Sequence, residues 1–370
     1  MQAPREQATS AAGPACAGTV RVRPAFWLFL LLLVLAEVAA RLWGPALPSC
    51  AAERRNPYRF RGWPVYVAGV RDFGATNRVV VVLSNCQGYG AELPGRVGFP
   101  AVLQNILAER AWQGDANWKV VNWSLDGATS IEYTILAAYL RTLHPDAVIA
   151  SLAFADFRAE NYREGWRYAR SDVPCLATRG SVLRQLPWSY LRRHWKAEDA
   201  LAAWAFDRLA LMRAAEYGWS WLEGHLPGVH FTLYAPAINY RPWRIEGEQP
   251  WLPGIRPVGV PRDQDLNLAY DERSAAMIDE LVSVLAAGHA PVLIVAQPFR
   301  DKHESATRFA QDLETAATQH GLPFCNLQTA IPAEEFLTSN HMNRRGHRRM
   351  AEALADALAG LPAAGEGNGR

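Results

Sequence analysis

The stretch VVVVLSNCQGYG, residues 79–90, joins an uninterrupted β-branched run to a turn that contains two glycines. A run that is apolar on both faces is typical of a central strand in a parallel sheet. The glycines that follow allow the chain to turn tightly into a helix. Because functional groups gather at the carboxyl ends of parallel strands, we expect residues 84–90 to lie at the functional edge of an α/β sheet.

The rest of the chain repeats this alternation of strands and helices. Short apolar runs predict further strands at residues 118–123, 147–153, 291–296 and 323–327. Amphipathic patterns predict helices at residues 101–110, 131–139 and 345–359. The alternation predicts a three-layer, flavodoxin-like α/β fold, with a parallel sheet and helices on both faces. A Trp- and Tyr-rich stretch at about residues 157–288, with helical segments near residues 200–222 and 272–285, is interpreted as a central insertion.

Charge and cysteine patterns exclude several classes of protein. Lys and Arg number 38 against 36 Asp and Glu, and no basic cluster is interleaved with aromatic residues. A nucleic acid is therefore not an expected partner. The five cysteines are scattered without Cys-x-x-Cys or Cys/His spacing, which indicates neither a zinc site nor a disulfide framework. No metal or other cofactor is expected.

Two residues from distant parts of the chain have the chemistry of a nucleophile and a base. Cys86 directly follows the first predicted strand, and a thiol, with an ordinary pKa of about 8.5, becomes more reactive beside a histidine. His341 precedes the last predicted helix, on a loop that the same edge of the sheet can recruit. Taken singly, Cys86 fits a buried inert residue and His341 a surface residue. Taken together, they match a nucleophile and a general base.

Four motifs, in this order along the chain, resemble those of the SGNH (GDSL-like) hydrolases. Residues 79–90 resemble the first block, usually Gly-Asp-Ser after an apolar strand, with Cys86 at the serine position. LDGATS, residues 125–130, resembles the second block and makes Gly127 a candidate for the oxyanion hole. SLAFADF, residues 151–157, resembles the third, usually Gly-x-Asn-Asp, with Ala155 and Asp156 at its last two positions. FLTSNHMNRRGH, residues 336–347, resembles the last, usually Asp-x-x-His, with His341 at the histidine.

Two further departures from the family pattern bear on activity. Ala155 replaces the asparagine, which removes a side-chain donor worth about 3 kcal/mol of transition-state stabilisation. Thr338 replaces the aspartate that would fix the tautomer of His341. A thiol needs less help from its base than an alcohol does, so a Cys-His dyad tolerates this loss better. Asn85, Gln87 and Ser124 are candidates for a substitute donor, and Asp156 and Thr338 for supporting roles.

The resemblance implies an esterase or O-acyltransferase that acts on acyl esters of a cell-surface glycan or a lipid-linked substrate. In such an enzyme Cys86 attacks the acyl carbonyl, His341 accepts the thiol proton, and the N–H groups of Cys86 and Gly127 hold the oxyanion. The alternative is a catalytically inactive SGNH-like binding or scaffold domain in envelope polysaccharide assembly, which Ala155 and Thr338 favour. An unrelated flavodoxin-like phosphate-binding protein is disfavoured, because the turn lacks a complete phosphate-loop signature.

The N-terminal part of the chain predicts attachment to a membrane. Residues 25–41 are almost entirely apolar, slightly short of the roughly 20 residues that span a bilayer, with Glu37 expected to reach the interface. A cleaved signal peptide is the competing interpretation. The predicted order is a leader (1–24), this anchor (25–41), a linker (42–77), the α/β domain (78–362) and a disordered tail (363–370). A single-pass inner-membrane location is expected, with the domain in the periplasm or outside the cell and a membrane-bound acyl donor protein as candidate partner.

Overall fold

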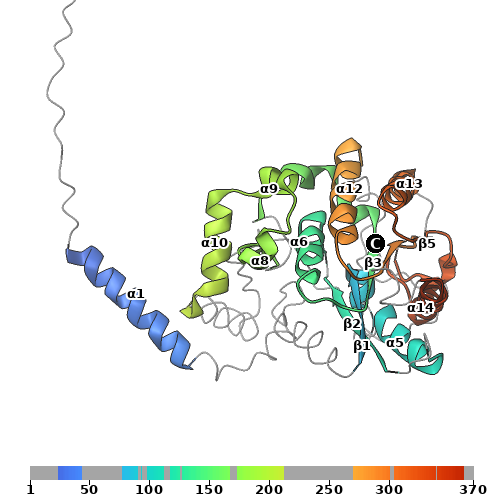
Figure 1. The fold of residues 1–370 in the computed structure, drawn as a ribbon, viewed down its shortest axis with the longest axis horizontal. Helices are drawn as coiled ribbons and strands as arrows, with labels where there is room; N and C mark the ends of the chain where they lie inside the picture. The colour runs from blue at the N-terminus through green and yellow to red at the C-terminus, as the bar shows by residue number, and fades with distance from the viewer. Residues whose placement is uncertain are drawn as a thin grey trace, which may run out of the picture.

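The computed structural model contains an α/β body and an N-terminal helix that lies apart from it (Figure 1). It describes residues 24–43, 77–90, 93, 98–111, 117–125, 127–166, 173–211, 270–300, 304–338 and 340–361. The predicted tail, nearly all of the predicted leader and linker, and residues 212–269 of the predicted insertion lie outside these ranges.

The body is built on a five-stranded sheet in which every pairing is parallel. The strand order is β2-β1-β3-β4-β5, which is the flavodoxin-like order, so the predicted parallel sheet of an α/β fold is confirmed. In this order β1 lies between β2 and β3: the chain runs outward from β1 to β2 and then crosses back past β1 to β3, which reverses the direction in which strands are added. The strands are β1 (Arg78–Ser84), β2 (Trp118–Ser124), β3 (Ala147–Leu152), β4 (Val292–Ala296) and β5 (Phe324–Asn326).

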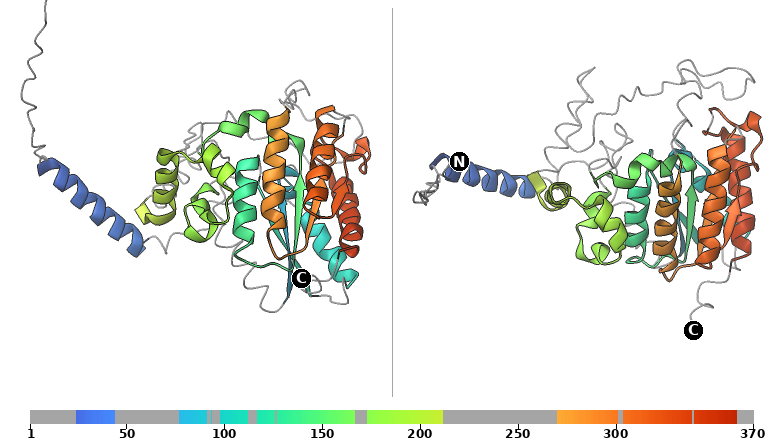
Figure 2. Two further views of the ribbon diagram at one scale, coloured as in Figure 1. Left: turned by 45° about the horizontal axis from the view of Figure 1, so that its top comes forward. Right: turned by 90° about the horizontal axis from the view of Figure 1, so that it is seen from above.

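Helices cover both faces of the sheet (Figure 2). One face carries α5 (Phe99–Glu109) and α14 (Arg344–Ala359), which pack on Val80 and Val82 of β1. The other carries α6 (Ser130–Leu140), α12 (Glu272–Ala286) and α13 (Glu304–Gln319), which pack around Val79, Val81 and Leu83. The alternating side chains of β1 thus enter two separate cores, and each buried aliphatic side chain contributes about 1.5–3 kcal/mol. This two-sided burial explains why the sequence of β1 is uniformly apolar.

The segment between β3 and β4 contains several short helices beside the sheet. Its described elements are η4 (Phe154–Phe157), η5 (Ala159–Arg163), α7 (Pro174–Ala177), α8 (Gly180–Leu183), α9 (Trp188–His194) and α10 (Ala197–Arg208), followed by α12. Although α12 falls within the range predicted as an insertion, it packs on α6 and α13 as the helix that leads into β4. Arg193 of α9 forms an ion pair with Glu280 of α12, so α9 is joined to the body.

Helix α1 (Pro24–Trp43) lies apart from the sheet and meets the C-terminal end of α10 (Figure 1). The Glu37 carboxylate accepts hydrogen bonds from the backbone N–H groups of Ala210 (3.0 Å) and Leu211 (2.8 Å). The side chain expected to reach a membrane interface therefore binds backbone donors of the same chain. Among the described residues, no helix meets both the length and the hydropathy that crossing a membrane requires.

Candidate active site

The carboxyl end of β1 turns directly into α4 (Cys86–Tyr89), a single helical turn. Asn85 begins this turn, and its side-chain oxygen accepts a hydrogen bond from the N–H of Gln87 at 3.0 Å. Gly90 ends it in the left-handed region, with φ of 66°, a conformation that glycine adopts without strain. Cys86 is therefore held at the strand-order reversal, the place where parallel α/β sheets bind their ligands.

Gly88 has a different role from Gly90, because it allows α4 to pack closely on the sheet. A Cβ atom at this position would lie 2.1 Å from Ser124 Oγ and 2.6 Å from Ser84 Cβ. The carbonyl of Gly88 also accepts a hydrogen bond from the side chain of Asn122, at 2.9 Å. The first of the two predicted turn glycines is thus required by packing and the second by backbone conformation.

His341 lies on a tight turn between η8 (Ala333–Glu335) and α14. Its carbonyl accepts hydrogen bonds from the N–H groups of Leu337 (2.7 Å) and Thr338 (3.2 Å). Its own N–H donates to Thr338 Oγ1 at 3.0 Å. Thr338, predicted as a replacement for the carboxylate that orients the imidazole, binds the backbone of His341 through its hydroxyl. The threonine therefore shapes the loop that carries the ring.

The structure brings Cys86 and His341 together across 255 residues of sequence, with 2.9 Å between Cys86 Sγ and His341 Nε2. Both side chains are half-buried. At this distance the imidazole can accept the thiol proton, which would generate a thiolate beside an imidazolium. The geometry thus has the two groups that thiol-based nucleophilic catalysis needs.

Asp156 is buried beneath the nucleophile. Its carboxylate accepts hydrogen bonds from Asn85 Nδ2 at 3.0 and 3.1 Å, from Tyr133 Oη at 3.1 Å and from the N–H of Ala153 at 3.2 Å. Burial raises the pKa of Asp156 from 3.8 to about 7, although these hydrogen bonds act in the opposite direction. Asp156 therefore supports the site by holding the residue that precedes Cys86.

The remaining predicted site residues are placed as follows. Gly127 is exposed in the turn after β2, with φ of 69°, and this turn is joined to β1 by a 2.9 Å hydrogen bond from Leu125 N to Ser84 O. Its role in an oxyanion hole stays a prediction. Ala155 is half-buried in η4. Gln87, one of the candidates for the substitute donor, donates from Nε2 to two backbone carbonyls.

Two functional candidates were missed by the motif comparison. Gln297, directly after β4, donates from Nε2 to Ser84 Oγ and to the carbonyl of Ser151, both at 2.8 Å, and so joins the ends of three strands. His347 accepts a hydrogen bond from the N–H of Phe99 at Nδ1, at 3.0 Å. Burial, together with the nearby charge of His341, lowers the pKa of His347 to about 4. A position just after a strand was the available sequence signal for Gln297.

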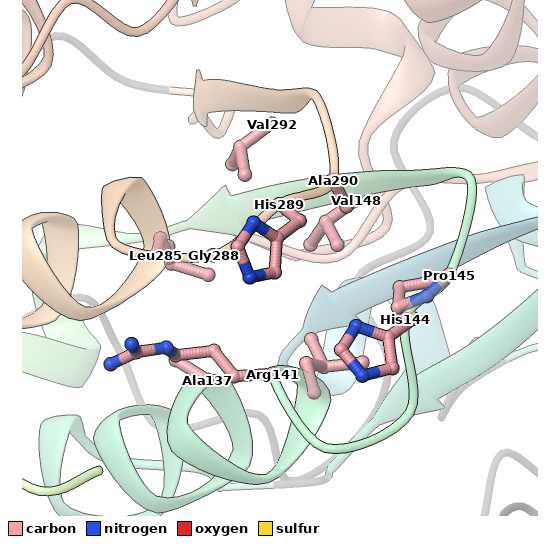
Figure 3. Close-up of a pocket in the computed structure, with 11 residues that line it drawn as sticks. Ala137, Arg141, His144, Pro145, Val148, Leu285, Gly288, His289, Ala290 and Val292 are labelled. Atoms are coloured by element: carbon pink, nitrogen blue, oxygen red, sulfur yellow. The ribbon is translucent and has the colours of Figure 1, made fainter. Parts of the chain in front are cut away.

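A pocket lies at the opposite edge of the sheet, where β3 and β4 begin (Figure 3). It is lined largely by apolar side chains, including Leu140, Val148 and Val292, with His144 and His289 at its rim. The two imidazole rings are 6.0 Å apart. Within the part of the chain that the structure describes, no group of three His, Cys, Asp or Glu side chains is placed to hold a metal ion.

Solved structures similar to this chain are esterases and related hydrolases. Est24, a carbohydrate acetylesterase from Sinorhizobium meliloti, is 12% identical over 76% of this chain and 99% of its own, with a TM-score of 0.38. LAE5, an α/β hydrolase from the metagenome of Lake Arreo, is 13% identical over 78% and 97%, with a TM-score of 0.40. Axe2, an acetylxylan esterase from Geobacillus stearothermophilus, is 12% identical over 77% and 95%, with a TM-score of 0.39.

No protein family model matches the chain, and no curated protein matches it. The contacts around Cys86 and His341 are therefore the observations from which a function is inferred.

Proposed function

We propose that this chain is an SGNH-like esterase or O-acyltransferase that uses Cys86 as its nucleophile and His341 as its general base. The observation that carries the proposal is the 2.9 Å separation of Cys86 Sγ and His341 Nε2. General-base catalysis requires this reach, and two residues so far apart in sequence meet only because the fold brings them together. The hydrogen-bonded support of Asn85 by Asp156 adds to the case, because it fixes the start of the turn that carries the thiol.

The proposed reaction proceeds through a thioester. His341 Nε2 takes the proton from Cys86, and the thiolate attacks the acyl carbonyl carbon to form a tetrahedral intermediate. The N–H groups of Cys86 and Gly127 are the proposed donors to its oxyanion. Collapse of the intermediate breaks the ester C–O bond, and the imidazolium returns its proton to the departing alkoxide. Water or a sugar hydroxyl, deprotonated by His341, then attacks the thioester and regenerates the thiol.

The proposal is tested by measuring the alkylation of individual cysteines in the full-length protein across pH. Peptide-resolved mass spectrometry after iodoacetamide treatment separates Cys86 from Cys175, which is buried and serves as an internal reference. We expect Cys86 to react near neutral pH, well below the ordinary thiol pKa of about 8.5, and His341→Ala to abolish this reactivity. Labelling of Cys86 no faster than that of Cys175 would contradict the dyad.

A second measurement separates an enzyme from the inactive domain, the alternative that Ala155 and Thr338 favour. The full-length protein is incubated briefly with p-nitrophenyl acetate and examined for an acetyl group on Cys86. Accumulation of the thioester in the wild type and its absence in Cys86→Ser support acyl transfer. A reactive Cys86 that takes up no acyl group would leave a binding or scaffold role in envelope polysaccharide assembly.

We also propose that residues 25–41 hold the protein at the inner membrane, with the α/β domain in the periplasm or outside the cell. Support comes from the apolar sequence and from α1, most of whose large apolar side chains are exposed, from Phe26 to Leu42. The proposed acyl acceptor is a cell-surface glycan or a lipid-linked substrate, and a membrane-bound protein is the proposed acyl donor. Alkaline extraction of membranes tests the attachment: the full-length chain should stay in the pellet, and its complete release would refute membrane anchoring.

A further inference from the structure

Gln87 follows Cys86 in α4, and its side chain is buried, with 1% of its surface exposed. Its Nε2 donates to two backbone carbonyls, that of Pro298 at 3.0 Å and that of Asn340 at 2.5 Å. Pro298 lies just after β4, and Asn340 directly precedes His341. One amide therefore joins the turn that carries the nucleophile to the loop that carries the base.

The hydrogen bond to Asn340 acts on the peptide group that links Asn340 to His341. The carbonyl of this peptide accepts from Gln87, and its N–H, which belongs to His341, donates to Thr338 Oγ1 at 3.0 Å. The peptide plane is thus held from both sides. Because a peptide group is rigid, fixing its plane fixes the Cα atom from which the imidazole projects.

We propose that Gln87 is a positioning residue, whose amide keeps the His341 imidazole within reach of the Cys86 thiol. This inference rests on the proposed function. Gln87 is covalently adjacent to Cys86, so the thiol and the clamp on the base belong to the same helical turn. Proton transfer needs the two groups within roughly 3 Å, and the Gln87 amide directly joins α4 to the loop of the base, 253 residues further along the chain.

A purely stabilising role explains Gln87 less well. Its Oε1 is buried and has no hydrogen-bond partner among the residues that the structure describes. Burying an unpaired carbonyl is unfavourable, so an apolar side chain of similar length would fill this position at less cost if packing alone mattered. The two N–H groups of the amide distinguish glutamine from the alternatives at this position. Methionine and leucine lack such donors, and glutamate cannot supply them when ionised.

The test compares two glutamine substitutions in the full-length protein. Gln87→Met keeps the length of the side chain and removes both donors. The matched control is Gln104→Met, because Gln104 also makes two backbone hydrogen bonds, to the carbonyl of Trp118 and from the N–H of Val120, both at 2.7 Å, but joins α5 to β2 away from the dyad. The readout is the pH profile of Cys86 alkylation, with thermal unfolding recorded in parallel.

We expect Gln87→Met to slow Cys86 alkylation at neutral pH by about tenfold, toward the rate of His341→Ala, and Gln104→Met to leave it unchanged. In a His341→Ala background, Gln87→Met should have no further effect, since there is then no imidazole to position. Thr338→Val, which removes the acceptor on the other side of the same peptide, should change the rate in the same direction, and it serves as the test if Gln87→Met does not fold.

Two failures are distinguishable. Wild-type reactivity that depends on His341 but is unaffected by both Gln87→Met and Thr338→Val would overturn the positioning role and leave the dyad in place. Gln87→Met could also slow Cys86 alkylation as much in the His341→Ala background as in the wild type. That result would overturn the positioning role as well, because the effect would then not act through the imidazole. Wild-type reactivity that is independent of His341 would overturn the proposed function itself.

Discussion

The two edges of the sheet differ in how they use buried polar groups. At the carboxyl edge, Asn85, Gln87, Asp156 and Gln297 are all buried and all hydrogen-bonded to neighbouring segments. At the amino edge, the pocket between β3 and β4 is lined mainly by aliphatic carbon, and His289 at its rim is exposed. The first edge is stabilised by specific directional contacts and the second by apolar packing.

This contrast indicates which edge is built to hold reacting groups. Apolar packing tolerates small displacements, whereas hydrogen bonds to fixed carbonyls and N–H groups define positions to within a few tenths of an ångström. Buried polar groups lose hydration, so a network of them at one edge is maintained against a free-energy penalty. The comparison predicts that perturbing the carboxyl edge changes both stability and thiol chemistry, while perturbing the amino edge changes neither the pKa nor the reactivity of the dyad.

The largest expected effect concerns the buried carboxyl of Asp156. Its pKa is about 7 in the fold and near 3.8 in the unfolded chain, so the folded protein holds this proton more tightly. The protonated Asp156 carboxyl therefore makes its full contribution to the free energy of unfolding below about pH 4, and this contribution is lost as the pH rises to about 7. With about 1.4 kcal/mol for each pKa unit, the free energy of unfolding should fall by up to about 4 kcal/mol over this range.

Asp156→Asn removes this titration and keeps an oxygen that can accept from Asn85. Denaturant unfolding of both proteins between pH 4 and pH 8 is the measurement, and the variant should gain stability relative to the wild type as the pH rises. Other groups, such as His347, titrate in both proteins and cancel in the difference. Parallel pH profiles for the two proteins would show that the Asp156 carboxyl has an ordinary pKa.

A smaller effect is expected at Gly88. In Gly88→Ala the added methyl would meet Ser124 Oγ and Ser84 Cβ, so α4 must move away from the sheet. We expect a loss of about 1–3 kcal/mol in the free energy of unfolding, together with slower alkylation of Cys86. Gly180→Ala is the control, because a Cβ there would meet a single atom within 4 Å, Arg184 Nη1 at 3.9 Å. Equal unfolding free energies for the two variants would refute the close approach of α4 to the strands.

The smallest effect is expected at the amino edge. His289→Ala changes an exposed residue at the rim of the pocket, at the other end of the strands from Cys86. The rate of Cys86 alkylation and its pH profile should match those of the wild type. A shift in that profile would show that the two edges are coupled and that the contrast between them is incomplete.

Much of the fold could be read from the sequence, because strand burial leaves a clear pattern. The run at residues 79–83 is apolar on both faces and forms the centre of the sheet. By contrast, α12 was included in the predicted insertion, since a Trp-rich stretch before it hid the return to the sheet. Its sequence carries an Asp271 cap and an amphipathic pattern, and only its packing on α6 and α13 assigns it to the body.

The site could be predicted in part. The meeting of Cys86 and His341 follows from a general property of parallel sheets, namely that strand ends and following loops converge at one edge. The partners of Gln87 could not be predicted, because they are backbone carbonyls that any residue type provides. The sequence shows only that Thr338 stands where the family has a carboxylate. It could not predict that the Thr338 hydroxyl binds the backbone of His341, because a motif does not specify which atoms a side chain contacts.

The distance along the chain between the thiol and the imidazole has a consequence for biogenesis. A polypeptide made from its amino end presents Cys86 long before His341, with the four strands β2, β3, β4 and β5 still to be synthesised between them. During that interval the thiol has no imidazole beside it. The Cys86 thiol and the His341 imidazole can therefore meet only after the last strand of the sheet has been made.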